Sequence, residues 1–300
     1  MLLFVNMLVI GITSRALFDL DESHAVYEDN GLEAYKDFQV ANEHIPLNPG
    51  QAFPLVNKLL ALNQKINKDK KVEVILLSRN TADTGLRVFN SIQHHGLDIK
   101  RAAFCGGGSP HTYAKSFGAQ LFLSTEFSDC NSSIQNGVAA ARIIPSGKTD
   151  KNEEALKVAF DGDSVIFSEE SQTIFDSKGL KAFDENERIL AKKPLLGGPF
   201  KPFLSALYGI QQEFPYKDCP IRIALVTARS APSHERVIRT LRDWDIRIDE
   251  SLFLGGLDKA EFLKDFGADI FFDDQIDNCQ SASLRTPTGH VISINQKNKS

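Results

Sequence analysis

The sequence predicts an α/β fold made of two tandem halves, each with a parallel sheet flanked by helices. Three observations predict it: the chain repeats itself at a fixed offset, its strand-like runs are apolar throughout, and these runs alternate with helical patterns. The length agrees, because 300 residues correspond to two domains of ordinary size. We expect one half at residues 1–150 and the other at residues 151–300.

The internal repeat is the strongest of these observations. An offset of 149 positions lays Ser78–Thr125 on Thr227–Asp274 without a gap, and 12 of these 48 positions are identical. Ordinary composition predicts about three identities by chance. Nearer the start of each half, an offset of 148 aligns Gly31 with Gly179. Two halves of similar architecture explain these matches better than unrelated segments that share generic turn signals.

The elements are expected in the same order in each half. Short apolar, β-branched runs predict buried strands, at Leu8–Ile12, Val72–Leu77 and Leu121–Leu123, and again at Val158–Phe160, Ile221–Val226 and Ile270–Phe272. A further strand in each half ends at a Gly-Gly pair. In the second half, Val237, Ile238, Leu241 and Trp244 share one face of a predicted helix, with Pro232 in its first turn.

Composition excludes several classes of protein. Apolar residues make up 42% of the chain and charged residues 24%, which is typical of a globular protein. The net charge of −5 provides no general footprint for nucleic acid. Four widely spaced cysteines indicate reduced thiols, and no apolar run is long enough to span a membrane. We therefore expect a cytoplasmic protein without nucleic-acid or membrane partners; a homo-oligomer is compatible with the large apolar fraction.

Both ends of the chain have a simpler interpretation than a targeting signal or a binding arm. The first twelve residues resemble a signal sequence in their apolarity, but no Lys or Arg precedes the apolar run and no cleavage site follows it. A buried first strand is the better interpretation. The basic tail Gln296–Ser300 is expected to be a disordered terminus.

Polar residues follow four strands of the second half. They are Asp161 and Asp163, Thr227, Lys259, and the pair Asp273 and Asp274. Ligands of parallel sheets bind beyond the carboxyl ends of the strands, where these side chains would meet. Carboxylates gathered in one cleft repel each other unless a cation holds them, and oxygen ligands of this kind suit Mg²⁺.

The same residue types can perform phosphoryl transfer. A carboxylate can attack phosphorus, and a second carboxyl two residues later can protonate the leaving oxygen. The hydroxyl of Thr227 and the ammonium of Lys259 would neutralise phosphoryl oxygens. Asp258 and Glu261 fit a capping box, which places Lys259 in the first turn of a helix. Arg229 is expected either to contact a phosphate or to form an exposed ion pair.

This ordered set resembles the four motifs of the haloacid-dehalogenase-like (HAD) phosphotransferases. The run from Ala159 to Ser171, together with Ser14–Leu20 and Leu77–Ser91, is similar to segments of the cytosolic 5′-nucleotidases of type I. The resemblance covers nearly the whole chain. It implies two HAD-like halves, each with an inserted cap segment, and a Mg²⁺-dependent hydrolysis of nucleoside 5′-monophosphates such as AMP.

The resemblance also implies roles for individual residues. Asp161 would be the nucleophile and Asp163 the acid and base, Thr227, Arg229 and Lys259 would bind the phosphate, and Asp161, Asp163, Asp273 and Asp274 would hold the metal. Two alternatives stay open: a phosphatase for another small phosphomonoester, such as a sugar phosphate, and a nucleotide-sensing binding protein.

The first half is expected to be catalytically silent. Ile12 stands where the second half has Asp161, and Ser14 stands where it has Asp163. Pro110 replaces Lys259, and Ser124 and Thr125 replace Asp273 and Asp274. The silent half is expected either to serve as a scaffold or to contact a ligand through polar groups at its strand ends and through the loop Gly106–Ser109.

The segment at about 168–220 would form the cap of the second half. Its aromatic residues Phe200, Phe203 and Tyr208 are expected either to stack on a base or to belong to the core. Ser168–Ser171 would either contact the substrate or form a solvated loop.

Overall fold

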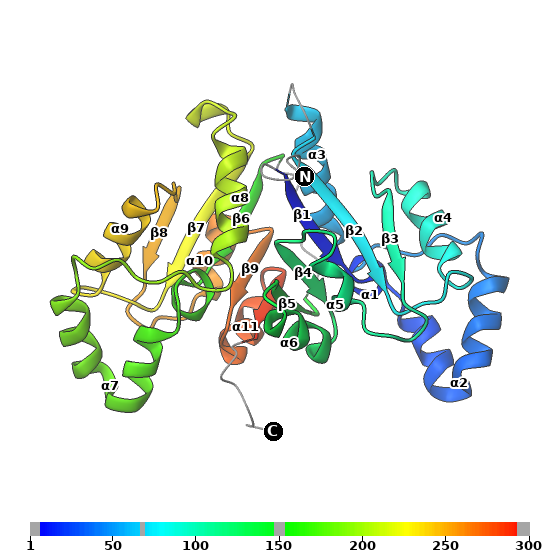
Figure 1. Cartoon of the computed structure of the whole chain (residues 1–300), viewed down its shortest axis with the longest axis horizontal. Helices are drawn as coiled ribbons and strands as arrows, with labels where there is room; N and C mark the ends of the chain where they lie inside the picture. The colour runs from blue at the N-terminus through cyan, green and yellow to red at the C-terminus, as the bar shows by residue number, and fades with distance from the viewer. Residues whose placement is uncertain (1–6, 67–69, 147–153, 293–300) are drawn as a thin grey trace. The chain divides into compact units, whose positions relative to one another are not determined.

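The protein has an α/β fold in which parallel strands form the sheet and helices flank it, as a computed structural model shows (Figure 1). The structure describes residues 7–66, 70–146 and 154–292. The chain divides into two compact units, Met1–Ile143 and Ile144–Ser300. The predictions for the first six residues and for the tail Gln296–Ser300 lie outside the described residues. Among the described residues, no helix is both long and apolar enough to cross a membrane.

In the first unit the strands lie in the order β3-β2-β1-β4-β5, and the pairs β1–β2, β1–β4, β2–β3 and β4–β5 are all parallel. The strands are β1 Leu8–Ile12, β2 Val72–Ser78, β3 Arg101–Phe104, β4 Leu121–Ser124 and β5 Ala139–Ile144. The helices are α1 Ser14–Leu17, α2 Asp21–Ala41, α3 Phe53–Lys65, α4 Leu86–His94, α5 His111–Ala114 and α6 Phe127–Gln135. The three strands predicted for this half are confirmed.

The second unit has the corresponding order β8-β7-β6-β9-β10, again with parallel pairs throughout. The strands are β6 Leu156–Phe160, β7 Ile221–Thr227, β8 Glu250–Phe253, β9 Ile270–Asp273 and β10 Thr288–Val291. The α-helices are α7 Glu170–Ile189, α8 Lys201–Gln211, α9 His234–Asp243, α10 Ala260–Phe266 and α11 Ile276–Ser283, and a short 3₁₀ helix covers Tyr216–Asp218. The predicted strands of this half are confirmed as well.

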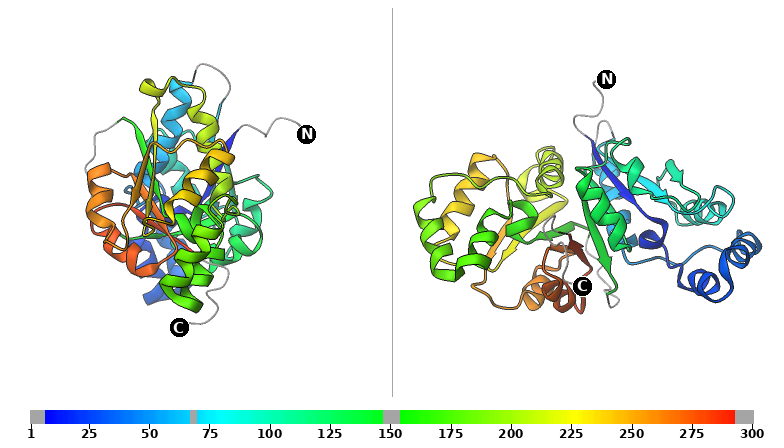
Figure 2. Two further views of the ribbon diagram at one scale, coloured as in Figure 1. Left: turned by 90° about the vertical axis from the view of Figure 1, so that its left-hand side faces the viewer. Right: turned by 60° about the horizontal axis from the view of Figure 1, so that its bottom comes forward.

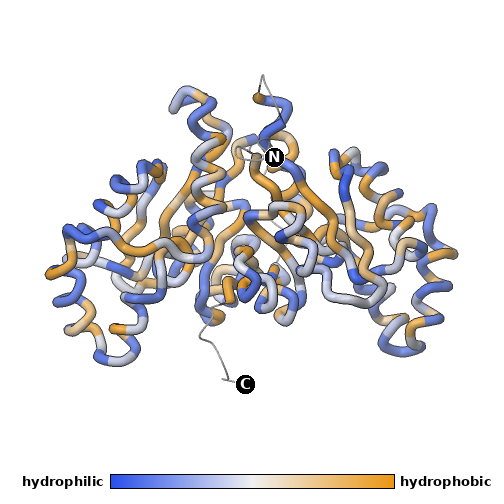
Figure 3. The backbone as a smooth tube through the Cα atoms, viewed as in Figure 1, coloured by the Kyte–Doolittle hydropathy of each residue, from blue (hydrophilic) through white to orange (hydrophobic). Residues whose placement is uncertain are grey.

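Both faces of the second unit's sheet are buried, which explains why its strands are apolar throughout. Successive side chains of a strand point to opposite faces. Phe271 packs in a cluster with Leu263 of α10 and Ala282 of α11, whereas Phe272 contacts Phe203 of α8 on the other face. Helices lie on both sides of the strands in each unit (Figure 2). In Figure 3 the strands form hydrophobic stretches, and the helices alternate between hydrophobic and hydrophilic residues.

A glycine breaks the long helix of each unit at the position that the repeat aligns. Gly31 in α2 has φ 82° and ψ −173°, and Gly179 in α7 has φ 76° and ψ 179°. This backbone conformation is accessible essentially only to glycine. Figure 1 shows each of the two helices bent into a pair of segments.

A second pair of glycines allows close approach of the chain after the first strand of each unit. A Cβ on Gly50 would lie 2.8 Å from the backbone N of Phe18, and one on Gly198 would clash with the carbonyl O of Phe167. Two side-chain hydrogen bonds also recur at aligned positions. The Nε of Arg87 donates to Ile45 O in the first unit, and the Nε of Arg236 donates to Lys193 O in the second. Likewise, Leu47 N donates to Ser91 Oγ, and Leu195 N donates to Thr240 Oγ1.

Two local predictions are wrong. Pro232 is not in the first turn of α9, because the hydrogen bond from Ser233 Oγ to Ser230 O closes a turn and the helix begins only at His234. Lys259 directly precedes α10 instead of occupying its first turn, since that helix begins at Ala260. Of the predicted capping box, the structure shows the hydrogen bond to the first residue: Asp258 accepts from the backbone N–H of Ala260 at 2.7 Å.

Candidate active site

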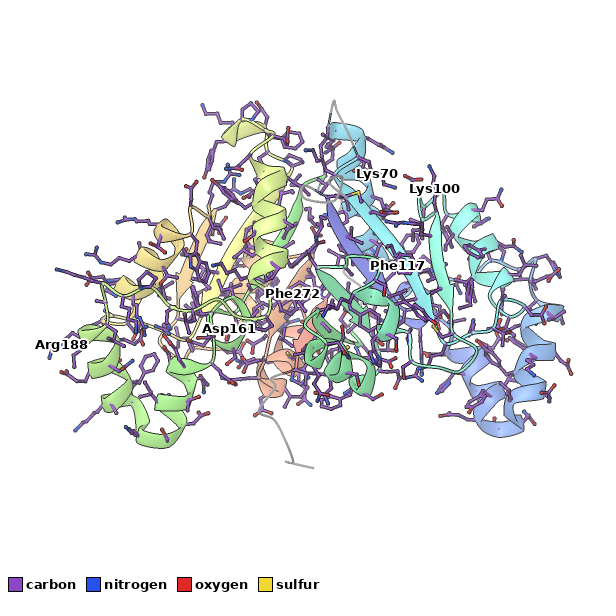
Figure 4. The ribbon with its side chains drawn as sticks, viewed as in Figure 1. Lys70, Lys100, Phe117, Asp161, Arg188 and Phe272 are labelled. Atoms are coloured by element: carbon purple, nitrogen blue, oxygen red, sulfur yellow. The ribbon has the colours of Figure 1, made fainter. Side chains whose placement is uncertain are left out.

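The central strand of the second unit ends at the first candidate residue. β6 lies between β7 and β9, and Asp161 follows it directly. The Asp161 N–H donates to the carbonyl O of Phe272 in β9 at 2.8 Å, which extends the sheet by one residue (Figure 4). The turn Gly162–Ile166 then carries the chain away from the sheet. A Cβ on Gly162 would lie 3.3 Å from Thr227 Oγ1, so the Thr227 hydroxyl lies against this turn.

Three carboxylates gather at this edge. Asp161, Asp273 and Asp274 each offer an oxygen atom, and these atoms all lie within 4.8 Å of one another. Lys259 lies among them, with its Nζ 2.8 Å from Asp161 Oδ1 and 2.7 Å from Asp273 Oδ2. All four residues are at most 7% exposed. The structure therefore brings together the nucleophile candidate, the acidic pair and the lysine that the sequence predicted.

Asp273 is held on both of its oxygens. While Oδ2 accepts from Lys259, Oδ1 accepts from the backbone N–H of Gln275 at 2.8 Å. The side-chain amide of Asn278, in α11, donates to both oxygens, at 3.3 and 3.1 Å. The sequence does not single out Asn278, because nothing in its surroundings distinguishes it from other helical amides.

The electrostatics of the cluster favour a cation. Burial, and then the charges of Asp161 and Asp273, raise the pKa of Asp274 to about 8. Burial also raises the pKa of Asp161, against the opposing effect of Lys259. Burial lowers the pKa of Lys259, but the carboxylates of Asp161 and Asp273 outweigh it and raise that pKa above its usual value. Lys259 thus pairs with two of the three buried acids, and an all-oxygen donor set of this kind fits a divalent metal ion.

Asp163 belongs to a different group of contacts. Arg229 donates to both of its carboxylate oxygens, with Nε 2.8 Å from Oδ2 and Nη2 2.7 Å from Oδ1. Asp163 is not a member of the metal-compatible group among the described residues. Its carboxylate therefore faces a guanidinium, and only the other three acids of the predicted metal site come together.

Arg229 lies in the interior of the unit. Its side chain is 2% exposed and pairs with Glu187 at 2.5 Å as well as with Asp163. Burial lowers the pKa of Arg229, but the two carboxylates raise it above its usual value. The prediction of an exposed ion pair is wrong for this residue, because its side chain is buried against Glu187 of α7. Contact with a phosphate stays a prediction.

Glu187 is the central residue that sequence analysis missed. It is fully buried in α7, where it also accepts from Arg236 at 2.9 Å and from Ser171 Oγ at 2.9 Å. Ser171 is itself buried at the start of α7, so a solvated loop is wrong for this residue. The aligned position in the first half, Gln39, is equally buried, but a single Glu in a polar helix gives no signal of its own.

The aromatic residues of the insert belong to the core. Phe200 and Phe203 are fully buried and pack on Phe160 and Phe272. Stacking of either ring on a nucleotide base is therefore wrong, because no face of the ring is left open. Tyr208 is half-buried in α8.

The corresponding edge of the first unit carries no carboxylate cluster among its described residues. Ile12 ends β1, and Ser14 Oγ lies 3.0 Å from Ser78 Oγ, both residues being buried. The amides of the glycine loop are already used: Gly106, Gly107 and Gly108 donate to the carbonyls of Asn80, Arg79 and Cys105. The three glycine amides of this loop are therefore not free to bind an anion.

Comparison with known proteins agrees with this geometry. The family model for 5′-nucleotidase matches residues 3–298. Human cytosolic 5′-nucleotidase 1B is 37% identical over 288 residues, which is 92% of this chain and 47% of the human protein. The chain thus spans about half the length of the curated relative that it matches.

Solved structures are much more distant. A universal stress protein from Pseudomonas aeruginosa UCBPP-PA14 has 9% identity and a TM-score of 0.39, covering 97% of this chain and 95% of that one. Histidinol dehydrogenase from Elizabethkingia anophelis has 11% identity and a TM-score of 0.24, covering 79% and 52%. These scores are too low to carry an argument. The family match over nearly all residues and the identity to the human enzyme show that the chain belongs to the 5′-nucleotidase family.

Proposed function

We propose that this protein is a Mg²⁺-dependent 5′-nucleotidase that hydrolyses nucleoside 5′-monophosphates through a phospho-aspartate at Asp161. The observation that carries the proposal is the cluster of Asp161, Asp273 and Asp274 around Lys259 at the carboxyl edge of a parallel sheet, in a chain of this family. Asp161, Asp273 and Asp274 would hold the metal ion. Bound there, Mg²⁺ would draw negative charge from the phosphoryl oxygens.

Asp161 acts as nucleophile in the first step. A carboxylate oxygen of Asp161 attacks phosphorus, and the bond from phosphorus to the ribose O5′ breaks. To give a proton to the leaving oxygen, Asp163 exchanges one of its two hydrogen bonds from Arg229 for a proton on that oxygen. Lys259, 2.8 Å from Asp161, and the hydroxyl of Thr227 bind phosphoryl oxygens as charge builds up on them.

Asp163 acts as base in the second step. It takes a proton from water, which attacks the phosphorus of the phospho-aspartate, so that phosphate leaves and Asp161 is restored. Arg229 is a positioning residue in this scheme: its two hydrogen bonds to Asp163 orient that group as the carboxylate that acts as base in this step. Glu187 balances the charge of Arg229 from α7.

The two units are, in this proposal, tandem HAD-like domains within residues 1–150 and 151–300, of which only the second is catalytic. The matching strand orders, the glycines that break α2 and α7 and the recurring hydrogen bonds support a duplication. The cap segments would be the helix pairs α2–α3 and α7–α8. Without a nucleophile at Ile12 the first domain cannot form the phospho-aspartate.

A phosphate-release assay tests the proposal. The substrates are AMP, dAMP, IMP and fructose phosphate, each with Mg²⁺ and with EDTA. We expect release from the nucleotides only with Mg²⁺, and a fall of about 10³-fold or more in Asp161→Asn. Asp265→Asn is the matched control, because Asp265 is exposed on α10 of the same unit, and it should retain full activity.

The same assay separates the alternatives. Faster release from fructose phosphate than from any nucleotide would reassign the substrate. Tight AMP binding with negligible turnover in Mg²⁺ would instead indicate a nucleotide-sensing protein. Substantial activity in Asp161→Asn would show that the nucleophile lies elsewhere.

A further inference from the structure

Four polar side chains at the carboxyl edge of the first unit's sheet have a buried atom with no hydrogen-bond partner. These atoms are Thr13 Oγ1, Asn80 Nδ2, His111 Nδ1 and Thr125 Oγ1. Thr13 is only 8% exposed. An unsatisfied buried polar group costs free energy, so several at one edge call for a ligand that the isolated chain does not contain. We call these four residues the orphan cluster.

The topology brings three members of the orphan cluster together. Thr13 follows β1, Asn80 follows β2 and Thr125 follows β4, and β1 lies between β2 and β4. The N–H of Thr13 donates to the carbonyl of Leu123 in β4 at 3.0 Å. Asn80 N donates to Ser78 Oγ at 3.2 Å, and Ser78 Oγ in turn lies 3.0 Å from Ser14 Oγ.

Neutral polar groups and ion-paired side chains lie at this edge. Arg79 pairs with the buried Asp129, which lies 3.8 Å from His111 Nδ1, and the guanidinium side chain remains 43% exposed. In the aligned active site of the second unit the same edge has four aspartates, whereas here Ile12, Ser14, Ser124 and Thr125 stand in their places. No metal-compatible acidic group is present among this unit's described residues. An oxyanion could therefore bind at this edge of the first unit without a divalent cation to compensate acidic side chains.

The orphan atoms suit the oxygens of a phosphoryl group. The two threonine hydroxyls, the Asn80 amide and the His111 ring can all donate hydrogen bonds, and a phosphoryl group accepts several at once. The geometry points to a phosphoryl-binding site at the carboxyl edge of the first unit, which binds a phosphate ion or the phosphate of a nucleotide without a divalent cation and without hydrolysing it. This inference goes beyond the proposed hydrolysis and does not depend on it.

The test is calorimetric titration of the full chain with inorganic phosphate in EDTA. Without a divalent cation, the acids of the second unit repel an anion, so binding under these conditions reports the first unit. The variant is Thr13→Val combined with Thr125→Val, which keeps the shape of both side chains and removes two hydroxyls that bond to nothing in the described structure. We expect phosphate binding to weaken about tenfold or more, with the melting temperature unchanged or raised.

Two controls locate the effect. Thr286→Val removes another unpartnered buried hydroxyl, in the second unit, and should leave phosphate binding unchanged. Lys259→Ala removes the phosphoryl ligand that the proposed mechanism places in the second unit, so phosphate binding in EDTA that persists in this variant belongs to the first unit. If the double variant fails to fold, each single substitution is titrated separately and should weaken binding about threefold.

Three results would overturn the inference. They are no saturable binding of phosphate in EDTA, binding by the double variant that equals that of the unchanged protein, and loss of binding in Lys259→Ala alone. Parallel titrations with AMP and with adenosine identify the source: tighter binding of AMP than of phosphate, with none of adenosine, indicates a nucleotide, and equal binding of AMP and phosphate indicates the free ion. These titrations do not measure turnover, so the nucleotidase proposal can fail independently.

Discussion

At the residue scale, buried carboxylates outnumber the buried ammonium group of Lys259 in the acidic cluster of the active-site edge. Lys259 pairs with Asp161 and Asp273, and Asp274 belongs to the same group of carboxylates. Burial of excess negative charge is unfavourable unless protons or a cation compensate it. The same residues that would bind the metal therefore make the metal-free protein sensitive to pH.

The free energy of unfolding of the metal-free protein is predicted to fall as the pH rises. The pKa of Asp274 is raised from 3.8 to about 8 in the folded protein. Within this window the folded chain holds a proton that the unfolded chain releases, so unfolding becomes easier as the pH increases. Thermal melting in EDTA across this range measures the effect.

Two controls accompany the melting experiment. Asp274→Asn should flatten the pH dependence, and Asp265→Asn should leave it unchanged. Added Mg²⁺ should stabilise the protein most at the alkaline end, where the carboxylates are ionised. A melting temperature that rises with pH in EDTA would contradict the proposed charge imbalance.

At the scale of elements, α7 is tied to the active-site edge by buried ion pairs. Glu187 contacts both Arg229 and Arg236, and Arg229 holds Asp163. The sequence could not reveal this network, because Glu185 and Arg188 form a similar but exposed pair on the same helix. Only the packing of α7 against the turn after β7 distinguishes the two.

Replacement of Glu187 by Gln is predicted to destabilise the protein by about 3 kcal/mol, because two guanidinium groups would remain buried with less compensation. Denaturant unfolding measures the change. Glu185→Gln, on the exposed face of the same helix, is the matched control and should behave like the unchanged protein. Equal stability of the two variants would show that the buried network is not needed for folding.

Strands were more predictable than contacts. The β-branched runs of β1, β2 and β7 identified them, because a strand buried on both faces has a sequence signature. The N-terminus of α9 was misplaced, since the turn closed by Ser233 is a local hydrogen-bonding choice. The aromatic residues of the insert had two interpretations from sequence, and the packing of Phe200 against Phe272 shows that they belong to the core.

At the scale of the whole molecule, two units of the same strand order carry different side chains at the same edge. The acidic cluster lies in the second unit, and the corresponding edge of the first unit has hydroxyls, an amide and the Arg79–Asp129 pair. The repeat in the sequence was sufficient to locate this difference, because the aligned positions fall at strand ends in both units. It was not sufficient to find Gln39 or Glu187, which are aligned but lie within helices of polar sequence.

The most direct test of the central claim is isolation of the covalent intermediate. The protein is mixed with AMP labelled in its phosphate and with Mg²⁺, the reaction is quenched in acid, and the peptides are analysed by mass spectrometry. Asp163→Asn is used in parallel, because loss of the base should slow hydrolysis of the intermediate. We predict that the label is attached to the peptide that carries Asp161 and that Asp161→Asn abolishes it. Label on another residue, or phosphate release with no labelled peptide in either protein, would contradict the account.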